Sequence, residues 1–239
     1  MIRIGMIGTG RIAKRFLLEA RSGGSVAVIG VYNPRRESAD AFSHANDVTG
    51  FYGLSELFAS VDAVYIASPH ETHFEYAKRA LMAGKHVLCE KPLCLKEEET
   101  KSLFSLAREK NLVLMEGVKT SYSPGFQKVL ELIDAGTIGD VAYVDACFTK
   151  LESKTSRELT DEVYGGSFRE LGSYVMLPAL KIFGCDISSH EFDCVYNDKN
   201  IDIFTKGTLR FKNGCVANMI CGLGVKGDGR LMVSGTKGY

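Results

Sequence analysis

The first half of the chain alternates short apolar runs with amphipathic stretches in which apolar residues recur at helical spacing. Apolar strands separated by helices are typical of β-α units and therefore of a parallel sheet. The predicted strands are residues 2–7, 26–32, 63–67, 86–90 and 112–116, and the predicted helices are residues 12–20, 38–45, 73–83 and 97–110. This alternation predicts a doubly wound α/β domain of the Rossmann type, which we assign to residues 1–118.

The second half has a different pattern, with two helices and a series of strands. Asn213-Gly214 is a typical hairpin turn and predicts that two of these strands pair side by side. Residues 150–165 are polar and show no periodicity, so we expect a loop there. The predicted helices are residues 124–135 and 165–183, and the predicted strands are residues 141–148, 191–196, 203–211, 216–223 and 231–234. The pattern predicts an α+β domain over residues 119–239 with an open, largely antiparallel sheet.

Charge and composition exclude several classes of partner. Charged residues make up 24% of the chain and their charges cancel, which leaves no basic surface for nucleic acid or an anionic membrane. No apolar run reaches the length of about 18 residues that spans a bilayer. The seven cysteines are an odd number, which favours reduced thiols. We therefore expect a cytoplasmic protein whose partners are small molecules or further copies of itself, with no nucleic acid and no membrane.

A glycine-rich turn joins the first predicted strand to the first predicted helix. Gly8-Thr9-Gly10-Arg11-Ile12-Ala13 matches G-x-G-x-x-A, and a second strand ends about 20 residues later, which is the context of a dinucleotide-binding turn. Gly8 allows the tight turn, Gly10 lets a pyrophosphate approach the backbone, and Ala13 lets the helix pack closely on the strand. We expect cofactor contacts from this turn, including Thr9 and Arg11. The alternative is an ordinary strand-to-helix turn.

The residues after the second predicted strand bear on the choice of cofactor. NAD-binding sites place an acidic residue here, which binds the ribose 2′-hydroxyl. The chain instead reads Asn33-Pro34-Arg35-Arg36, and two arginines suit the 2′-phosphate of NADP(H). We therefore favour NADP(H), with Asn33, Arg35 and Arg36 as contacts. The alternative is that both arginines belong to a solvated helix start, in which case NAD(H) stays open.

Two histidines follow the strand predicted at residues 63–67. Ser68-Pro69-His70-Glu71-Thr72-His73 is similar to the zinc motif H-E-x-x-H, but the spacing is one residue short, so the i, i+4 ligand pair is not formed. The chain contains no C-x-x-C pair either, and we predict no metal site. Doubly wound folds bind ligands at the carboxyl ends of their strands. We therefore expect Ser68, Pro69, His70 and His73 near the nicotinamide; the alternative is that His73 simply starts a helix.

Glu90-Lys91-Pro92 stands at the end of the fourth predicted strand, with Cys89 and Cys94 on either side. A residue before proline is held in extended geometry, so we expect Lys91 to point from the strand end toward the cofactor. A lysine in that position can exchange a proton with a substrate hydroxyl while hydride moves to or from the nicotinamide. The alternative is a surface lysine paired with Glu90. We interpret both cysteines as packing residues.

Four segments resemble the Gfo/Idh/MocA oxidoreductase family: GTGRIA, VDAVYIASPHETHFEYAKRALMAGKHVLCEKPL, GGSFRELGSYVMLPALKIFG and SGTKGY. They occur in order along the chain, and AGKHVLCEKP is among the most specific segments of the family. The resemblance implies a Rossmann domain and an α+β domain whose open sheet often forms a dimer, so we expect a homo-oligomer. It also implies that Lys91 handles the proton and binds the substrate hydroxyl. The cofactor contacts that it implies are Gly8, Gly10, Ile12, Pro69, His70, His73, Glu90 and Lys91.

The second domain departs from the pattern of the inositol dehydrogenases in this family. These relatives have Asp and, four residues later, His, where this chain has Glu170 and Tyr174. The tyrosine is similar to the glucose–fructose oxidoreductase and dihydrodiol dehydrogenase branch, which implies that Tyr174 is the acid–base partner of Lys91. Ser121 stands where many relatives have arginine, and Lys119 is the alternative source of positive charge. The resemblance thus implies substrate contacts from Lys119, Glu170 and Tyr174.

The function that the resemblance implies is an NAD(P)-dependent dehydrogenase or reductase. It would transfer hydride between nicotinamide and a secondary hydroxyl or ketone of a sugar, polyol or related diol. Two alternatives stay open: a non-catalytic relative that binds dinucleotide as a sensor or regulator, and a reductase of a non-sugar ligand such as a linear tetrapyrrole. Relatives usually continue well beyond G-T-K-G-Y, so we expect the second domain to be incomplete at its C-terminus.

Overall fold

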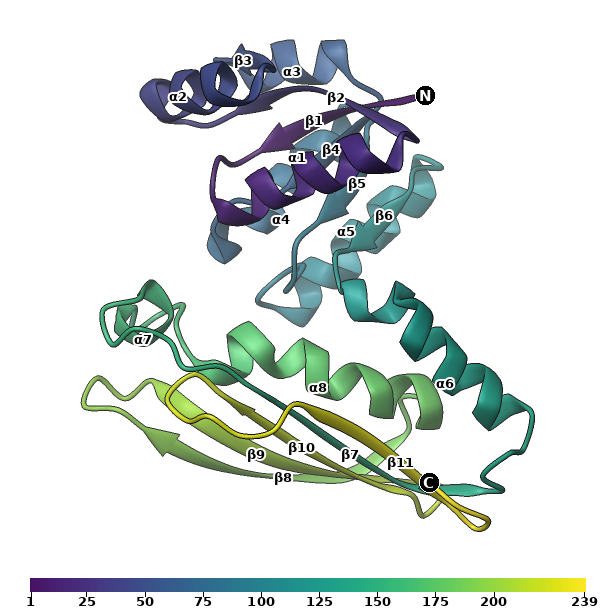
Figure 1. The fold of residues 1–239 in the computed structure, drawn as a ribbon. Coiled ribbons are helices and arrows are strands. Elements are labelled where there is room, and N and C mark those ends of the chain that lie inside the picture. The colour runs from purple at the N-terminus through teal and green to yellow at the C-terminus, as the bar shows by residue number, and fades with distance from the viewer. The chain divides into compact units, whose positions relative to one another are not determined.

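The computed structural model describes residues 1 to 239, which divide into two compact units, Met1–Gly117 and Val118–Tyr239 (Figure 1). Each unit has its own sheet and its own hydrophobic core. The predicted fold class, a Rossmann-type parallel sheet followed by an α+β domain with an open, largely antiparallel sheet, is confirmed.

The first unit is built on a six-stranded parallel sheet in the order β3-β2-β1-β4-β5-β6. This is the strand order of a doubly wound dinucleotide-binding sheet. The strands are β1 (Ile2–Ile7), β2 (Val26–Tyr32), β3 (Thr49–Phe51), β4 (Ala63–Ile66), β5 (His86–Cys89) and β6 (Leu114–Glu116). The helices are α1 (Arg11–Gly23), α2 (Arg36–Asn46), α3 (Leu54–Ser60), α4 (His73–Met82) and α5 (Glu97–Glu109), with a short 3-10 helix η1 (His70–Thr72) before α4.

Apolar side chains alternate between the two faces of this sheet. Met6 of β1 and Tyr65 of β4 belong to the cluster formed with α1 and α2. Ile7 of β1 and Ile66 of β4 belong to the opposite cluster, which is formed with α3, α4 and α5. Because helices cover both faces, the strands need apolar residues on both sides and read as continuous apolar runs in the sequence.

The sequence pattern missed β3 and α3. Strand β3 has three residues and helix α3 has seven, so neither is long enough for a period of 2 or 3.6 residues to stand out. The strand predicted at residues 112–116 begins only at Leu114, because the Leu112 amide still donates to the Ala107 carbonyl at the end of α5 (2.8 Å).

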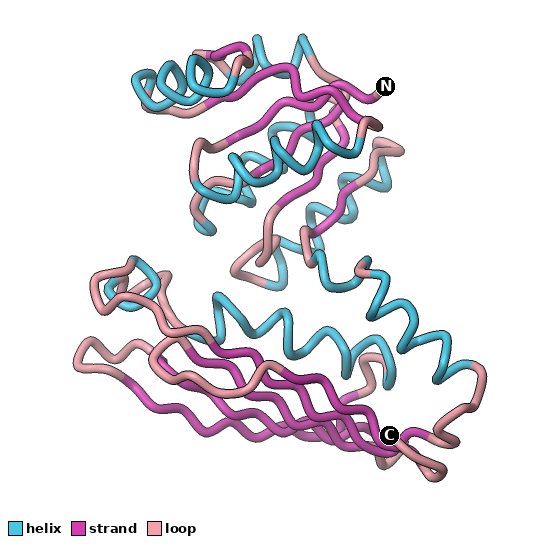
Figure 2. The backbone as a smooth tube through the Cα atoms, viewed as in Figure 1, coloured by secondary structure: helices cyan, strands magenta, loops and turns pink.

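The second unit has a five-stranded sheet in the order β11-β7-β10-β9-β8, antiparallel except for the pair β7 and β10. Helix α8 runs along one face of this sheet (Figures 1 and 2), where its Leu171, Val175 and Ala179 join the core. The strands are β7 (Val141–Thr149), β8 (Ile187–Tyr196), β9 (Asp202–Phe211), β10 (Val216–Gly222) and β11 (Arg230–Gly235). The helices are α6 (Pro124–Asp134), α7 (Arg157–Thr160) and α8 (Ser167–Phe183), with a 3-10 helix η2 (Lys119–Tyr122) before α6.

The residues predicted as a loop, 150–165, contain the four-residue helix α7. Asp161 ends this helix, and its carboxylate accepts hydrogen bonds from the amides of Val163 (3.0 Å) and Tyr164 (2.9 Å). Short helices stabilised by such local side-chain bonds leave no hydrophobic period in the sequence. The predicted hairpin is confirmed, since Gly214 has a φ of 87° and lies between the antiparallel strands β9 and β10.

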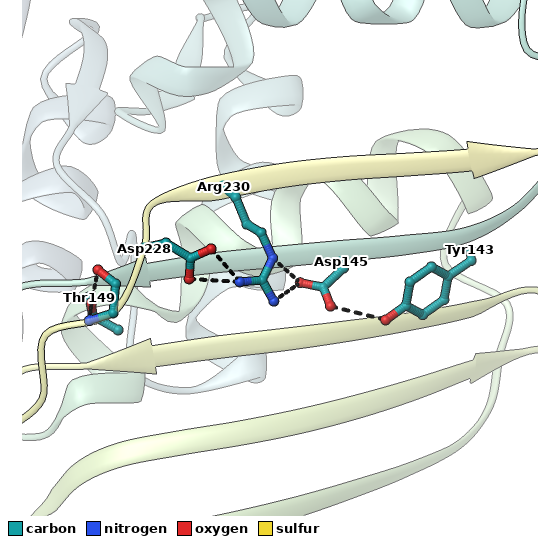
Figure 3. Close-up of polar contacts among 6 residues, drawn as sticks. Tyr143, Asp145, Thr149, Asp228 and Arg230 are labelled. Carbon is teal, nitrogen blue, oxygen red and sulfur yellow. Dashed lines mark hydrogen bonds and ion pairs between the residues drawn. The ribbon is translucent and has the colours of Figure 1, made fainter. Parts of the chain in front are cut away.

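The face of this sheet away from α8 carries a polar network (Figure 3). The Asp145 carboxylate of β7 accepts hydrogen bonds from the Tyr143 hydroxyl (3.0 Å) and from Arg230 Nε of β11 (3.1 Å). Arg230 Nη1 also donates to Asp228 (2.6 Å), and this hydrogen bond lowers the pKa of the Asp228 carboxyl. The network therefore fastens β11, at one edge of the sheet, to its neighbour β7.

The seven cysteines are unpaired. Cys89 lies in the core of the first unit and Cys94 packs partly buried against it, which confirms the interpretation of both as packing residues. Burial raises the pKa of the Cys94 thiol to about 11, so this thiol is weakly nucleophilic at neutral pH. Among the helices of both units, none combines the length and the apolar character needed to cross a membrane.

Candidate cofactor and catalytic site

The carboxyl ends of β1, β4 and β5 carry most of the residues singled out in the sequence. The three strands are neighbours in the parallel sheet, so their carboxyl ends meet at one edge, about 5 Å apart from strand to strand. The Ala67 amide donates to the Ile7 carbonyl (2.8 Å), and the Glu90 amide donates to the Ile66 carbonyl (2.9 Å). The parallel sheet thus brings the glycine turn, the Ser68 loop and Lys91 into one row.

The glycine turn after β1 fits a bound pyrophosphate. Gly8 has a φ of 110°, and a Cβ atom on it would lie 2.4 Å from the Ala67 carbonyl oxygen, so only glycine is accommodated. Gly10 precedes α1, and a Cβ atom on it would meet nothing within 4 Å. No side chain caps the start of α1 and no acid lies in its first turn. The amides of this helix start are therefore suited to bind an anionic group.

The candidate ribose end lies after β2. Asn33 donates from Nδ2 to the Thr9 hydroxyl (2.8 Å), which links this segment to the glycine turn, and its Oδ1 accepts from the Arg35 amide (2.9 Å). Arg36 stacks over the Tyr52 ring at 4.1 Å from its centroid. Arg35 is the residue that precedes α2, and both arginines are exposed, so either guanidinium is accessible to a 2′-phosphate.

The Ser68 loop leaves β4 and enters α4 through η1. The hydroxyls of Ser68 and Thr72 lie 2.7 Å apart, and the Pro69 carbonyl accepts from the Thr72 amide (2.9 Å). Pro69 is exposed and His70 is half-buried, whereas His73 has no exposed surface. The loop therefore presents Ser68, Pro69 and His70 at the strand ends, with His73 behind them.

Lys91 follows β5 and is only 6% exposed. It is therefore not a surface lysine, and lysine is almost never fully buried unless it is paired. The turn that carries it is tied to the end of β6, because the Leu93 amide donates to the Glu116 carboxylate (2.9 Å). The Gly117 amide likewise donates to the Cys89 carbonyl (2.6 Å). These bonds hold the Lys91 turn against its neighbouring strand.

Tyr65 is a residue of the site that the sequence interpretation missed. Its hydroxyl donates to Glu90 Oε1 (2.6 Å), and its ring stacks on Phe16 at a centroid distance of 3.8 Å. Burial, and to a lesser degree the Glu90 carboxylate, raise the pKa of Tyr65, so the phenol keeps its proton and holds the Glu90 carboxylate by this hydrogen bond. In the sequence, Tyr65 is marked only by its hydroxyl group in an otherwise apolar strand. That pattern does not indicate that Glu90 is its hydrogen-bond partner.

The candidate substrate residues Lys119, Glu170 and Tyr174 all lie in the second unit. Glu170 and Tyr174 are one turn apart on α8 and share a face of the helix. Tyr174 is half-buried, with its ring edge-to-face against Phe148 of β7 at a centroid distance of 5.4 Å. Lys119 is the exposed first residue of η2.

The histidines of the Ser68 loop do not gather further ligands around them. No group of three or more His, Cys, Asp or Glu side chains has the arrangement of a metal site. The ring of His70 lies edge-on to the ring of His73 at a centroid distance of 5.6 Å.

The strand order of the first unit, together with the glycine turn after β1, defines a dinucleotide-binding Rossmann domain. Comparison with known families agrees: residues 2–118 match an oxidoreductase family with an NAD-binding Rossmann fold, and residues 126–239 match the GFO/IDH/MocA C-terminal domain. The chain therefore belongs to the Gfo/Idh/MocA oxidoreductase family, as its motifs predicted.

Individual relatives are named as dehydrogenases and reductases. The chain is 34% identical over 195 residues to scyllo-inositol 2-dehydrogenase (NADP(+)) IolU of Bacillus subtilis strain 168, which covers 77% of this chain and 59% of IolU. It is 31% identical over 234 residues to dTDP-3,4-didehydro-2,6-dideoxy-alpha-D-glucose 3-reductase of Actinomadura kijaniata, covering 93% of this chain and 68% of that protein. KijD10, a 3-ketoreductase of Actinomadura kijaniata solved with NADP and TDP-benzene, superposes with a TM-score of 0.87 at 29% identity, over 98% of this chain and 74% of that chain. The chain thus spans about three fifths of the length of IolU.

Proposed function

We propose that this chain is an NADP(H)-dependent oxidoreductase acting on a secondary hydroxyl or ketone of a sugar, polyol or related diol. The observation that carries the proposal is the row formed by the ends of β1, β4 and β5, which aligns an anion-binding glycine turn with the buried Lys91. The names of the relatives support the substrate class, since they act on an inositol and on a dTDP-sugar.

In this proposal, some residues of the row bind the cofactor and Lys91 transfers the proton. The Gly8–Gly10 turn and the start of α1 would hold the pyrophosphate, and Ser68, Pro69, His70 and Glu90 would line the nicotinamide end. NADP(H), when bound, accepts or supplies the hydride. Oxidation of the alcohol also releases the hydroxyl proton, which Lys91 Nζ would take, and reduction would return it. Tyr65 holds the carboxylate of Glu90, the residue before Lys91, by its hydrogen bond.

Tyr174 is proposed as the second proton-handling group, with Lys119 and Glu170 as substrate contacts. Its phenol can donate or accept one proton, and replacing it with phenylalanine removes that capacity while keeping the ring packed on Phe148. In an assay of sugars and polyols with NADP+ and NAD+, followed by the absorbance of the reduced nicotinamide, Tyr174→Phe should lower kcat by about 100-fold. A control, Tyr122→Phe at an exposed position of η2, should leave kcat unchanged.

Two results of this assay would count against the proposal. If Tyr174→Phe keeps full kcat on a substrate that the parent chain turns over, the tyrosine has no part in proton transfer. If the chain binds NADP(H) and turns over none of the compounds, the alternative of a non-catalytic dinucleotide sensor is favoured instead.

The preference for NADP(H) is proposed to rest on Arg35 and Arg36. Replacing both with alanine removes two guanidinium groups that can pair with a 2′-phosphate but not with a 2′-hydroxyl. We expect NADPH affinity to fall by about 100-fold, or about 2.7 kcal/mol, while NADH affinity changes less than about threefold. Fluorescence titration of both dinucleotides measures this. Equal losses of affinity for NADPH and NADH would show that the arginines do not recognise the 2′-phosphate.

A cytoplasmic homo-oligomer is the assembly that we propose for this chain. The supporting feature is the sheet face opposite α8, where Arg230, Asp145 and Asp228 form a fixed polar surface beside exposed Met232, and where Val195 is exposed on β8 at the other edge of the sheet. A sheet face of mixed character, uncovered by any helix of its own unit, suits contact with a second copy.

A further inference from the structure

His73 is buried, and both of its ring nitrogens face backbone oxygen atoms of the candidate site. It is the first residue of α4, it has no exposed surface, and its ring lies between the two loops that leave β4 and β5. Nδ1 lies 2.8 Å from the Pro92 carbonyl oxygen, and Nε2 lies 2.9 Å from the Ser68 carbonyl oxygen. Both ring nitrogens are therefore at hydrogen-bond distance from backbone oxygen atoms.

Two carbonyl oxygens can only accept, so each nitrogen has to donate. A neutral imidazole carries one N–H group, and its other nitrogen is an acceptor. A neutral His73 would therefore place a nitrogen lone pair against a carbonyl lone pair at a position with no exposed surface, where repulsion between the two is costly. Residue 92 is proline and has no amide hydrogen that could donate in place of its carbonyl. The imidazolium form satisfies both contacts with charge-assisted hydrogen bonds.

We propose that His73 is a buried imidazolium that clamps the Ser68 loop to the Lys91 turn and thereby positions Lys91. Pro92 directly follows Lys91, so a bond that fixes the Pro92 carbonyl also fixes the backbone from which the lysine side chain leaves. The other bond fixes Ser68 at the end of β4. The clamp rests on the proposed function for its catalytic consequence, but its charge and its geometry do not depend on that function.

The groups around His73 bear on its charge. His70 lies edge-on to it, and Lys91 precedes the proline that it contacts; both disfavour a further positive charge. The start of α4, to which His73 belongs, also disfavours a cation. Glu90 and Glu116 carry negative charge, which favours the charged form of His73. Glu90 precedes Lys91 in the chain, and the Glu116 carboxylate accepts a hydrogen bond from the amide of Leu93, the residue after Pro92. Glu71 of η1, two residues before His73, is a third carboxylate on the adjoining segments of the chain.

The charge of His73 can be measured directly in the unmodified chain. In protein labelled with 15N in histidine, NMR should show two N–H groups on His73 at pH 7.5. His44, which is exposed on α2, serves as the internal reference. A single N–H group on His73 at pH 7.5, with the other nitrogen unprotonated, overturns the proposal. This experiment needs neither substrate nor cofactor.

The positioning role is tested with His73→Gln, and His44→Gln is the matched control. We expect kcat to fall at least tenfold in His73→Gln while the Kd for NADPH changes less than threefold, because the glycine turn, Arg35 and Arg36, which are proposed to hold the phosphate groups, are not altered. Amide exchange of peptides covering residues 66–69 and 90–94 should become at least fivefold faster, and His44→Gln should change none of these values. Unchanged exchange in a folded His73→Gln protein overturns the clamp, whether or not the chain turns over a substrate. If two N–H groups and faster exchange are seen but no compound is turned over, the clamp stands and the proposed oxidoreductase function fails.

Discussion

Replacing Lys91 with alanine is expected to lower kcat/KM by about 1,000-fold or more, which corresponds to roughly 4 kcal/mol of transition-state stabilisation. The physical reason is that alanine cannot take up or return the proton of the reacting hydroxyl. NADP(H) binding should change less than about threefold, because the glycine turn, Arg35 and the Ser68 loop remain in place. Steady-state kinetics with the best substrate found, together with a cofactor titration, measure both quantities.

A control variant at a second lysine shows whether the loss of turnover is specific to Lys91 or follows from the loss of any lysine charge. Lys110→Ala removes an exposed lysine at the end of α5 and should leave kcat/KM and cofactor affinity unchanged. Undiminished turnover in Lys91→Ala would remove the lysine from the reaction. A parallel loss of cofactor affinity and turnover would instead give Lys91 a binding role.

Gly8→Ala is expected to lower the free energy of unfolding by about 3 kcal/mol and to abolish NADP(H) binding. The added methyl group would lie 2.4 Å from the Ala67 carbonyl oxygen, in a backbone conformation with φ of 110° that alanine rarely adopts. Gly10→Ala should behave differently, since its methyl group would meet nothing within 4 Å of the protein and its φ is −78°. Its unfolding free energy should stay within about 0.5 kcal/mol of the parent value, while NADP(H) affinity falls about 100-fold, because the methyl group fills the space of the pyrophosphate.

Urea denaturation without cofactor measures the stability of both variants, so that ligand binding does not alter the comparison. A Gly8→Ala protein as stable as the parent would contradict the turn geometry. A Gly10→Ala protein that is stable and binds NADP(H) normally would contradict the assignment of the pyrophosphate to this turn.

The longer elements were predictable because their signals are local. The bounds of β1 and β2 were predicted to the residue, because both are continuous apolar runs, and α5 was predicted within one residue, because its apolar residues recur at helical spacing. Strand β3 and helix α7 were missed because three or four residues contain too few repeats of any period. The network of Arg230 with Asp145 was also missed, because it joins residues 85 positions apart and follows from the pairing of β7 with β11.

In the candidate site, too, local patterns were predictable and tertiary contacts were not. The sequence alone determined which residues stand at the strand ends and which of them have side chains suited to the proposed chemistry, because a glycine turn, a pre-proline lysine and paired arginines are local patterns. Only the tertiary structure decided that Lys91 is buried, that Tyr65 holds Glu90, and that His73 bonds Ser68 and Pro92. Each of these depends on which strands become neighbours and on which side chains then share the space between them. A local pattern records neither, because hydrogen bonds across the sheet edge join residues that are far apart along the chain.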